Sequence, residues 1–398
     1  MSIMKQIKST FFPFLLVFYE IACYLSNDMY LSAIPDLMQD LQLSGKQAQF
    51  TLTVWFLGLA GMPLFLAAIS DKFGRRVVLL NGGFIYVLST IICAITSNYS
   101  IFLVARFIEG GMASSMMVAG YAAIHESYDH KAAIRILAIM GSISIMAPAL
   151  GPLFGGILLL FTSWRVIFWL IAIWAFIAIL LLMKWMPETL SKEKSNKINI
   201  TNLFKTYKNI LLNPNFMLLM CILGCFFAGF ITWITAGPLL VIKYFHYSPT
   251  FFGILQAIVF GFYIIGNALV NKLLDKIEVN NLIKIGMFIV FLGCLLISIV
   301  TLLFPFSLLC FVAALLIFSF GTGLCFAPLN RTIIEASDEP MGSRVALFTI
   351  FLTFFAAIGS GVAGIYFNGT LLSLAMIMGC FTFIAFLIKI GLSIKYSF

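Results

Sequence analysis

The feature that most constrains this chain is the recurrence of apolar runs of about twenty residues between short polar breaks. A helix of about 20 residues spans a bilayer and satisfies its own backbone hydrogen bonds in lipid. The pattern therefore predicts an all-α integral membrane protein with twelve transmembrane helices. The predicted spans are 11–34, 49–69, 77–97, 101–124, 133–159, 164–186, 215–242, 250–272, 281–303, 305–330, 344–367 and 371–394.

Composition agrees with this prediction and excludes a soluble domain. The chain of 398 residues is 62% hydrophobic and only 10% charged, which leaves too little polar surface to face water. The net charge of +9 is explained by position, because of all the lysines and arginines other than Arg106 only Lys46, Arg165 and Lys243 would face away from the cytoplasm. This asymmetry follows the positive-inside rule, so both termini are predicted to be cytoplasmic and no nucleic-acid partner is expected.

A polar segment divides the predicted spans into two equal groups. Residues 188–214 are rich in Lys, Asn and Ser, and 203–212 have enough amphipathic character for a surface helix. We therefore expect an N-terminal six-helix bundle at 1–187, a cytoplasmic central loop at 188–214 and a C-terminal six-helix bundle at 215–398. The sequence SDKF at 70–73 aligns with LDKI at 274–277, which indicates an internal duplication typical of transporters built from two parallel repeats.

The first predicted span contains two carboxylates, Glu20 and Asp28. A charge at mid-bilayer is costly, so an intramembrane acid is a functional-site hypothesis by default. At about 100° per residue, Tyr24 and Asn27 fall on the same helix face as the two acids. We therefore predict that this face lines a water-filled cavity and does not contact lipid.

Arg106 lies a few residues into the fourth span and needs a partner there. Glu109, three residues later, could form a local ion pair that only makes burial tolerable. Alternatively, Arg106 could act on the carboxylates of the first span and take part in proton coupling. No charge falls at the centre of a second-half span, where neutral groups such as Gln256 and many aromatic residues suit an apolar molecule.

The loop between the second and third spans reads SDKFGRR at 70–76. Asp71 can cap the next helix, Gly74 permits a close turn, and Arg75 and Arg76 can anchor at lipid headgroups. A plain positive-inside anchor would use the same residues, but the position between spans two and three of twelve resembles the signature loop of the major facilitator superfamily.

The fifth span contains APALGPLFGG at 147–156. Pro148, Gly151 and Gly155 share one helical face, so another helix can pack closely there, and Pro148 and Pro152 can bend the helix. The stretch resembles the antiporter motif of proton-coupled drug exporters, although plain helix packing would also explain its glycines.

Other chemistry finds no support in the sequence. The eight cysteines lie in apolar segments without ligand spacing, and no phosphate-binding loop, catalytic triad or metal-spaced cluster occurs. We therefore expect neither an enzyme nor an ATP-driven pump, and we expect no metal and no cofactor. The resemblance to proton-coupled exporters implies a proton gradient as the energy source.

The resemblance to the drug:proton antiporters of the major facilitator superfamily extends over nearly the whole chain. It is carried by residues 19–20, 24–31, 34–35, 106–111, 120–127, 187–189, 253–256, 266–267 and 336–338, besides the two motifs above. It implies a twelve-helix exporter in which Glu20 and Asp28 bind protons and cationic substrate, Arg106 couples them, and Tyr24 and Asn27 line the pocket.

The function expected from this resemblance is proton-coupled efflux of lipophilic, often cationic, compounds across a bacterial inner membrane. The expected partners are a small-molecule drug or metabolite, protons and the lipid bilayer, and we expect a monomer. The alternative is a dedicated exporter or importer of one metabolite, such as a siderophore, on the same scaffold. A membrane sensor is a third class, but the sequence shows no obvious output module.

Overall fold

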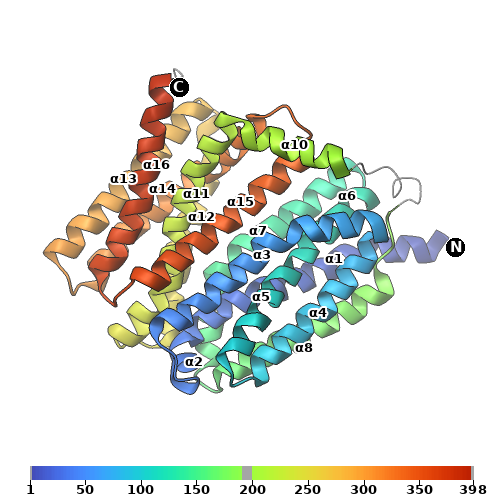
Figure 1. The fold of residues 1–398 in the computed structure, drawn as a ribbon, viewed down its shortest axis with the longest axis horizontal. Coiled ribbons are helices and arrows are strands. Elements are labelled where there is room, and N and C mark those ends of the chain that lie inside the picture. Colours follow the sequence, from blue (N-terminus) through green and yellow to red (C-terminus); the bar gives the residue numbers. More distant parts are fainter. Residues whose placement is uncertain (1, 191–199, 396–398) are drawn as a thin grey trace.

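The computed structural model describes residues 2–190 and 200–395, and every regular element within these ranges is helical. Figure 1 shows the helices of the first half packed side by side, next to a second group formed by the later helices. The elements of the first half are α1 Ser2–Asp28, α2 Ile34–Asp40, α3 Gly45–Phe73, α4 Arg75–Ile95, α5 Tyr99–Ser115, α6 Tyr121–Ser127, α7 His130–Leu158 and α8 Trp164–Trp185. Those that follow are α10 Ile200–Leu212, α11 Pro214–Pro238, α12 Pro249–Leu274, α13 Val279–Leu303, α14 Leu308–Glu335, α15 Met341–Tyr366 and α16 Leu371–Lys395.

Eleven helical segments within the described ranges are long and apolar enough to cross a membrane. α1 is not among them, but it has 27 residues and packs against α7 and α8. With α1 included, one helical segment matches each of the twelve predicted spans. The all-α membrane fold predicted from the sequence is therefore confirmed.

The helices begin where the polar breaks supply capping groups. Ser44 and Gln47 form a reciprocal capping box at the start of α3, and Asn213 Oδ1 accepts hydrogen bonds from two backbone N–H groups at the start of α11. Pro214 occupies the first turn of α11, where a missing N–H costs nothing. These caps satisfy backbone donors that the apolar segments cannot satisfy themselves.

The first span differs from the prediction in its second half. The α-helix ends at Asp28 and continues as a 3₁₀ turn at Met29–Ala33 before α2 begins, instead of running unbroken to residue 34. Two tertiary hydrogen bonds hold the turn: Ser32 Oγ donates to the Pro152 carbonyl at 2.6 Å, and the hydroxyls of Tyr30 and Thr51 lie 2.7 Å apart. The break therefore comes from packing that the hydrophobic pattern does not encode.

Two hydrogen bonds between the two groups of helices lie toward one end. Figure 1 shows α10 near the same end as both termini and α2 at the other, and we call these the α10 end and the opposite end. α3 packs against α15 and α7 against α12. The hydroxyls of Thr53 and Ser360 lie 2.9 Å apart, and Thr250 Oγ1 donates to the Gly156 carbonyl at 3.1 Å. Both contacts lie toward the opposite end, so the halves are closed against each other there.

The predicted amphipathic helix at 203–212 is confirmed as part of α10. Asn209 Nδ2 donates to Glu339 Oε1 at 2.7 Å, and Ile210 is fully buried. Tyr207 lies within reach of the charge of Asp71, and burial together with that charge raises the pKa of its phenol. α10 therefore touches the second half while lying near the 70–76 loop of the first. Lys192, Lys194 and Lys197, which contribute to the predicted charge asymmetry, lie outside the described residues.

Candidate functional site

Arg106 and Glu109 form an ion pair on α5 in the interior of the first half. Arg106 Nη1 lies 2.5 Å from Glu109 Oε2, and both side chains are 0% exposed. Thr90 Oγ1 on α4 donates to the other carboxylate oxygen of Glu109 at 2.9 Å. The local ion pair considered from the sequence is therefore present, and Thr90 is a partner that sequence reasoning missed.

The guanidinium of Arg106 also reaches the first span. Its Nη2 donates to Asn27 Oδ1 at 2.9 Å. Its central carbon lies 4.9 Å from the ring centre of Tyr30 and 5.8 Å from that of Trp55. Aromatic faces attract a buried cation, so this cage helps offset the loss of water. Asn27 thus holds Arg106 against the first span, and its predicted role in substrate binding stays a prediction.

Asp28 lies at the junction of α1, its 3₁₀ turn and α7. A Cβ on Gly151 would lie 2.5 Å from the Asp28 Cβ, and one on Gly155 would lie 2.2 Å from the Met29 carbonyl oxygen. These glycines let the α7 backbone touch the acid-bearing segment, as the shared-face argument predicted. Pro152 contributes the carbonyl that holds Ser32, whereas the structure assigns no contact of this kind to Pro148.

Glu20 lies two helical turns before Asp28 and is fully buried. Its Oε1 accepts a hydrogen bond from the hydroxyl of Tyr121 at 2.9 Å, whereas its Oε2 is buried without a hydrogen-bond partner in the described structure. Tyr121 begins α6 directly after a π-helical turn at Met116–Gly120, which rotates it relative to α5. Tyr24, between the two acids, is partly exposed and interacts electrostatically with both.

Gln256 is the candidate from the second half, and it lies on α12. Its Oε1 accepts a hydrogen bond from Trp233 Nε1 on α11 at 2.8 Å, and its Nε2 is buried without a partner among the described residues. The recorded hydrogen bond stays within the second half, so this structure does not join Gln256 to the acids of α1. Its predicted role in substrate binding stays a prediction.

The 70–76 loop forms a network that the sequence predicted only in part. Arg75 pairs with Asp71 and, at 3.1 Å, with Glu126. Asp71 does not cap α4 as expected. Instead, Glu188 after α8 accepts the backbone N–H groups of Arg75 and Arg76 at 2.9 and 3.2 Å.

Gly74 and Arg76 complete this network. Gly74 has a φ of +108°, and a Cβ there would lie 2.4 Å from a Glu188 carboxylate oxygen. Arg76 Nη2 donates to the Met183 carbonyl at 2.6 Å. The loop therefore ties the start of α4 to the end of α8. This is a more specific arrangement than anchoring at lipid headgroups.

Within the described part of the first half, the buried side chains of Asp, Glu, Lys and Arg residues are Glu20, Asp28, Arg106 and Glu109. Only Arg106 and Glu109 are joined to each other directly, and Asn27 bridges them to α1. Such a cluster can bind and release protons, and its unpaired carboxylates can attract a cation. Tyr121 and Trp233 were not predicted as site residues. Tyr121 lies in the stretch 120–127 that carries the family resemblance, whereas Trp233 offered only an aromatic N–H within an apolar span.

Comparison with known proteins gives the family. A family model described as the Major Facilitator Superfamily matches residues 16–363. The chain is 29% identical over 371 residues to the chloramphenicol resistance protein CraA of Acinetobacter baumannii, an alignment that covers 89% of this chain and 88% of that protein. It is 31% identical over 336 residues to the multidrug transporter MdfA of Yersinia pestis, covering 84% and 82%. Identity to the multidrug resistance protein MdtM of Salmonella typhimurium is 27% over 366 residues, covering 92% and 88%.

Solved structures share the fold at low sequence identity. A bacterial homolog of the human lysosomal transporter Spinster gives a TM-score of 0.71 at 15% identity, covering 96% of this chain and 95% of that one. A POT family transporter crystallised with a thioalcohol-conjugated peptide gives 0.73 at 16%, covering 96% of both chains. Because the family model matches most of the sequence and the helical fold agrees, this multi-pass membrane protein belongs to the Major Facilitator Superfamily.

Proposed function

We propose that this chain exports lipophilic, often cationic, compounds from a bacterial cytoplasm in exchange for protons. The names of the relatives support export of drugs, since they are a chloramphenicol resistance protein and multidrug transporters. The site supports coupling of transport to a proton gradient, because such coupling needs buried groups that bind and release protons. On this proposal the protein acts as a monomer of the inner membrane without a cofactor, and it is not an enzyme.

The observation that carries the proposal is the pair of carboxylates on α1. Neither Glu20 nor Asp28 forms a salt bridge in the described part of the chain, because Glu109 already pairs with Arg106. A buried carboxylate without a cation is costly, so it gains by binding either a proton or a cationic substrate. Competition between the two is then the exchange mechanism: protonation releases the drug, and deprotonation restores attraction for the next molecule.

Alternating access would follow from movement of 1–187 against 215–398, with 188–214 as the link. The two halves contact each other at the opposite end, for example between Thr53 and Ser360, and this supports a state that opens toward α10. The distribution of basic residues supports α10 and both termini in the cytoplasm, and hence the opposite end in the periplasm. The state described here is then inward-facing, ready to take up a drug from the cytoplasm.

Cysteine labelling tests this orientation. Lys208→Cys lies on the exposed side of α10, and Ser97→Cys lies between α4 and α5 at the opposite end. In an otherwise cysteine-free protein in intact cells, a membrane-impermeant maleimide should label Ser97→Cys and should label Lys208→Cys only after permeabilisation. The reverse pattern would overturn the proposed orientation.

Drug susceptibility in a host without its own pumps tests the proposed activity. Expression should raise resistance to the cations tetraphenylphosphonium and ethidium and to neutral chloramphenicol, and a protonophore should abolish efflux. Glu20→Gln and Asp28→Asn should each weaken export of the cations more than that of chloramphenicol, because the apolar contacts remain. No resistance to any of the three compounds would instead favour an exporter or importer of one metabolite.

A further inference from the structure

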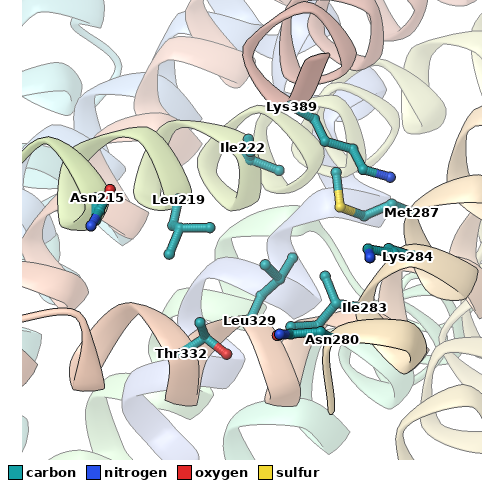
Figure 2. A pocket seen from close by; sticks show the side chains of 10 residues that line it. All are labelled: Asn215, Leu219, Ile222, Asn280, Ile283, Lys284, Met287, Leu329, Thr332 and Lys389. Carbon is teal, nitrogen blue, oxygen red and sulfur yellow. The ribbon is translucent and has the colours of Figure 1, made fainter. Parts of the chain in front are cut away.

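A pocket far from the acids of α1 lies among α11, α13, α14 and α16, toward the α10 end. Its volume, counted as the space open to the centre of a water-sized sphere, is about 70 Å³, and it is partly open to the surroundings. Figure 2 shows its lining, which is mainly aliphatic and carries a few polar groups: Asn215, Leu219, Ile222, Asn280, Ile283, Lys284, Met287, Leu329, Thr332 and Lys389. The mixture of an apolar wall with a few charged groups is typical of a site for an amphipathic ligand.

Two lysines give this pocket a positive end. Figure 2 shows Lys284 of α13 and Lys389 of α16 on either side of Met287, and each lysine lies in the electrostatic field of the other. Neither forms a salt bridge or a hydrogen bond within residues 2–190 and 200–395, and no carboxylate lines the pocket. Two like charges held together repel each other, so an anion placed between them would be stabilised by both.

Both lysines lie at the depth expected of lipid headgroups. Lys284 is five residues from the start of α13, and Lys389 is six residues from the end of α16. At 1.5 Å per residue these positions lie roughly 8–9 Å inside the helix ends. Long basic side chains at such depths reach the phosphate region of the bilayer.

A second pocket continues the first toward the lipid-facing surface. Its volume, counted in the same way, is about 60 Å³. It shares Met287 and Lys389 with the first pocket and is otherwise lined by Phe226, Phe288, Phe291, Thr382 and Phe386. Phe288 is 65% exposed, so in a membrane-spanning helix it contacts lipid. A free phosphate ion would leave this aromatic path unused, whereas an acyl chain would cover it.

At the other side of the first pocket, Asn215 offers a buried polar atom. Its Oδ1 has no hydrogen-bond partner in the described structure. An unsatisfied buried acceptor is costly, and a hydroxyl group on a ligand could donate to it. Phosphatidylglycerol combines a phosphate anion, a headgroup with hydroxyls and acyl chains.

From these features we propose that the pocket binds an anionic phospholipid from the leaflet at the α10 end. Its phosphate lies between Lys284 and Lys389, its glycerol headgroup points toward Asn215, and an acyl chain follows the aromatic path past Phe288. The proposal concerns the second half only and does not depend on which substrate the transporter carries.

Lipid binding to the full-length purified protein tests this site. Native mass spectrometry in detergent would compare phosphatidylglycerol with phosphatidylcholine of identical acyl chains. The wild-type protein should prefer phosphatidylglycerol, and Lys284→Gln with Lys389→Gln should weaken its binding about 30-fold, given roughly tenfold per 1.4 kcal/mol and about 1 kcal/mol per lysine. The matched control is Lys272→Gln with Lys276→Gln, two exposed lysines at the same end that lie outside the pocket.

Asn215→Asp provides a second variant of unchanged size, and its added negative charge should also weaken phosphatidylglycerol binding. Size-exclusion elution and the unfolding midpoint would show that each variant is folded. Binding of phosphatidylglycerol that both pocket variants leave unchanged would overturn the proposal. So would an equal loss in the control variant, or displacement of the lipid by excess inorganic phosphate, which would point to a soluble phosphate ligand.

Discussion

Replacing the buried pair of Arg106 and Glu109 separates a structural role from a coupling role. The perturbation is a set of three variants: Arg106→Gln, Glu109→Gln and the double variant. If Arg106 only neutralises Glu109, the double variant should recover everything that the single variants lose, because no buried charge then remains unpaired. If Arg106 also acts on the acids of α1, stability should recover but transport should not.

The size of the effect on stability follows from the geometry. The two groups lie 2.5 Å apart and both are 0% exposed, so removing one leaves a buried, uncompensated charge. Breaking such a pair costs about 3–5 kcal/mol, whereas replacing both charges is often nearly neutral. Arg106→Gln should be the more damaging single variant, because the hydrogen bond to Asn27 is also disturbed. The double-mutant cycle should therefore give a coupling energy of at least about 3 kcal/mol.

Two assays read the two roles separately. Denaturant unfolding in detergent measures stability, and proton-driven uptake of tetraphenylphosphonium into everted vesicles measures transport. We expect the double variant to unfold like the wild type yet fail to transport, because the field of Arg106 on Asp28 is lost. Arg106→Lys should keep partial function, since it retains the charge but loses the planar fork.

Two outcomes would refute this reasoning. Additive losses of stability in the double variant would show that the pair does not carry the expected coupling energy. Wild-type-like, proton-coupled transport by the double variant would show that Arg106 serves only to neutralise Glu109.

Two further predictions follow from close contacts. Gly155→Ala should destabilise the protein by about 1–3 kcal/mol and reduce transport, because its Cβ would lie 2.2 Å from the Met29 carbonyl oxygen. The control is Gly141→Ala on the same helix, whose Cβ would meet nothing within 4 Å. This control should behave like the wild type in unfolding and uptake assays. Glu188→Gln should lower the unfolding free energy by about 1 kcal/mol, because it weakens the cap of α4. Glu335→Gln, which removes one partner of an exposed ion pair, should change the unfolding free energy little. Equal effects of the two substitutions would contradict the capping role of Glu188.

The number of membrane-spanning helices and the close packing of α7 against a neighbouring segment could be predicted, because both depend on local sequence patterns. Apolar runs of spanning length fix the number of spans, and the shared face of Gly151 and Gly155 anticipated the contact of α7 with the segment that carries Asp28. The acids of α1 could also be identified from the local sequence as candidate site residues, because a charge in an apolar run is costly wherever it occurs.

The remaining details depend on partners distant in sequence. The end of α1 at Asp28 reflects hydrogen bonds from Tyr30 and Ser32 to other helices, and the cap of α4 comes from Glu188, more than a hundred residues later. The hydroxyl of Tyr121 reaches Glu20 across 101 positions of sequence. A single sequence carries no signal for such pairings, because any polar group of suitable size could supply the same hydrogen bond.

The central claim is that Glu20 and Asp28 exchange protons for substrate. The most direct test adds tetraphenylphosphonium to purified, weakly buffered protein and records proton release with a pH-sensitive dye. The wild-type protein should release protons on binding, whereas Glu20→Gln with Asp28→Asn should release none while remaining folded. Proton release of wild-type size from that double variant would contradict the claim.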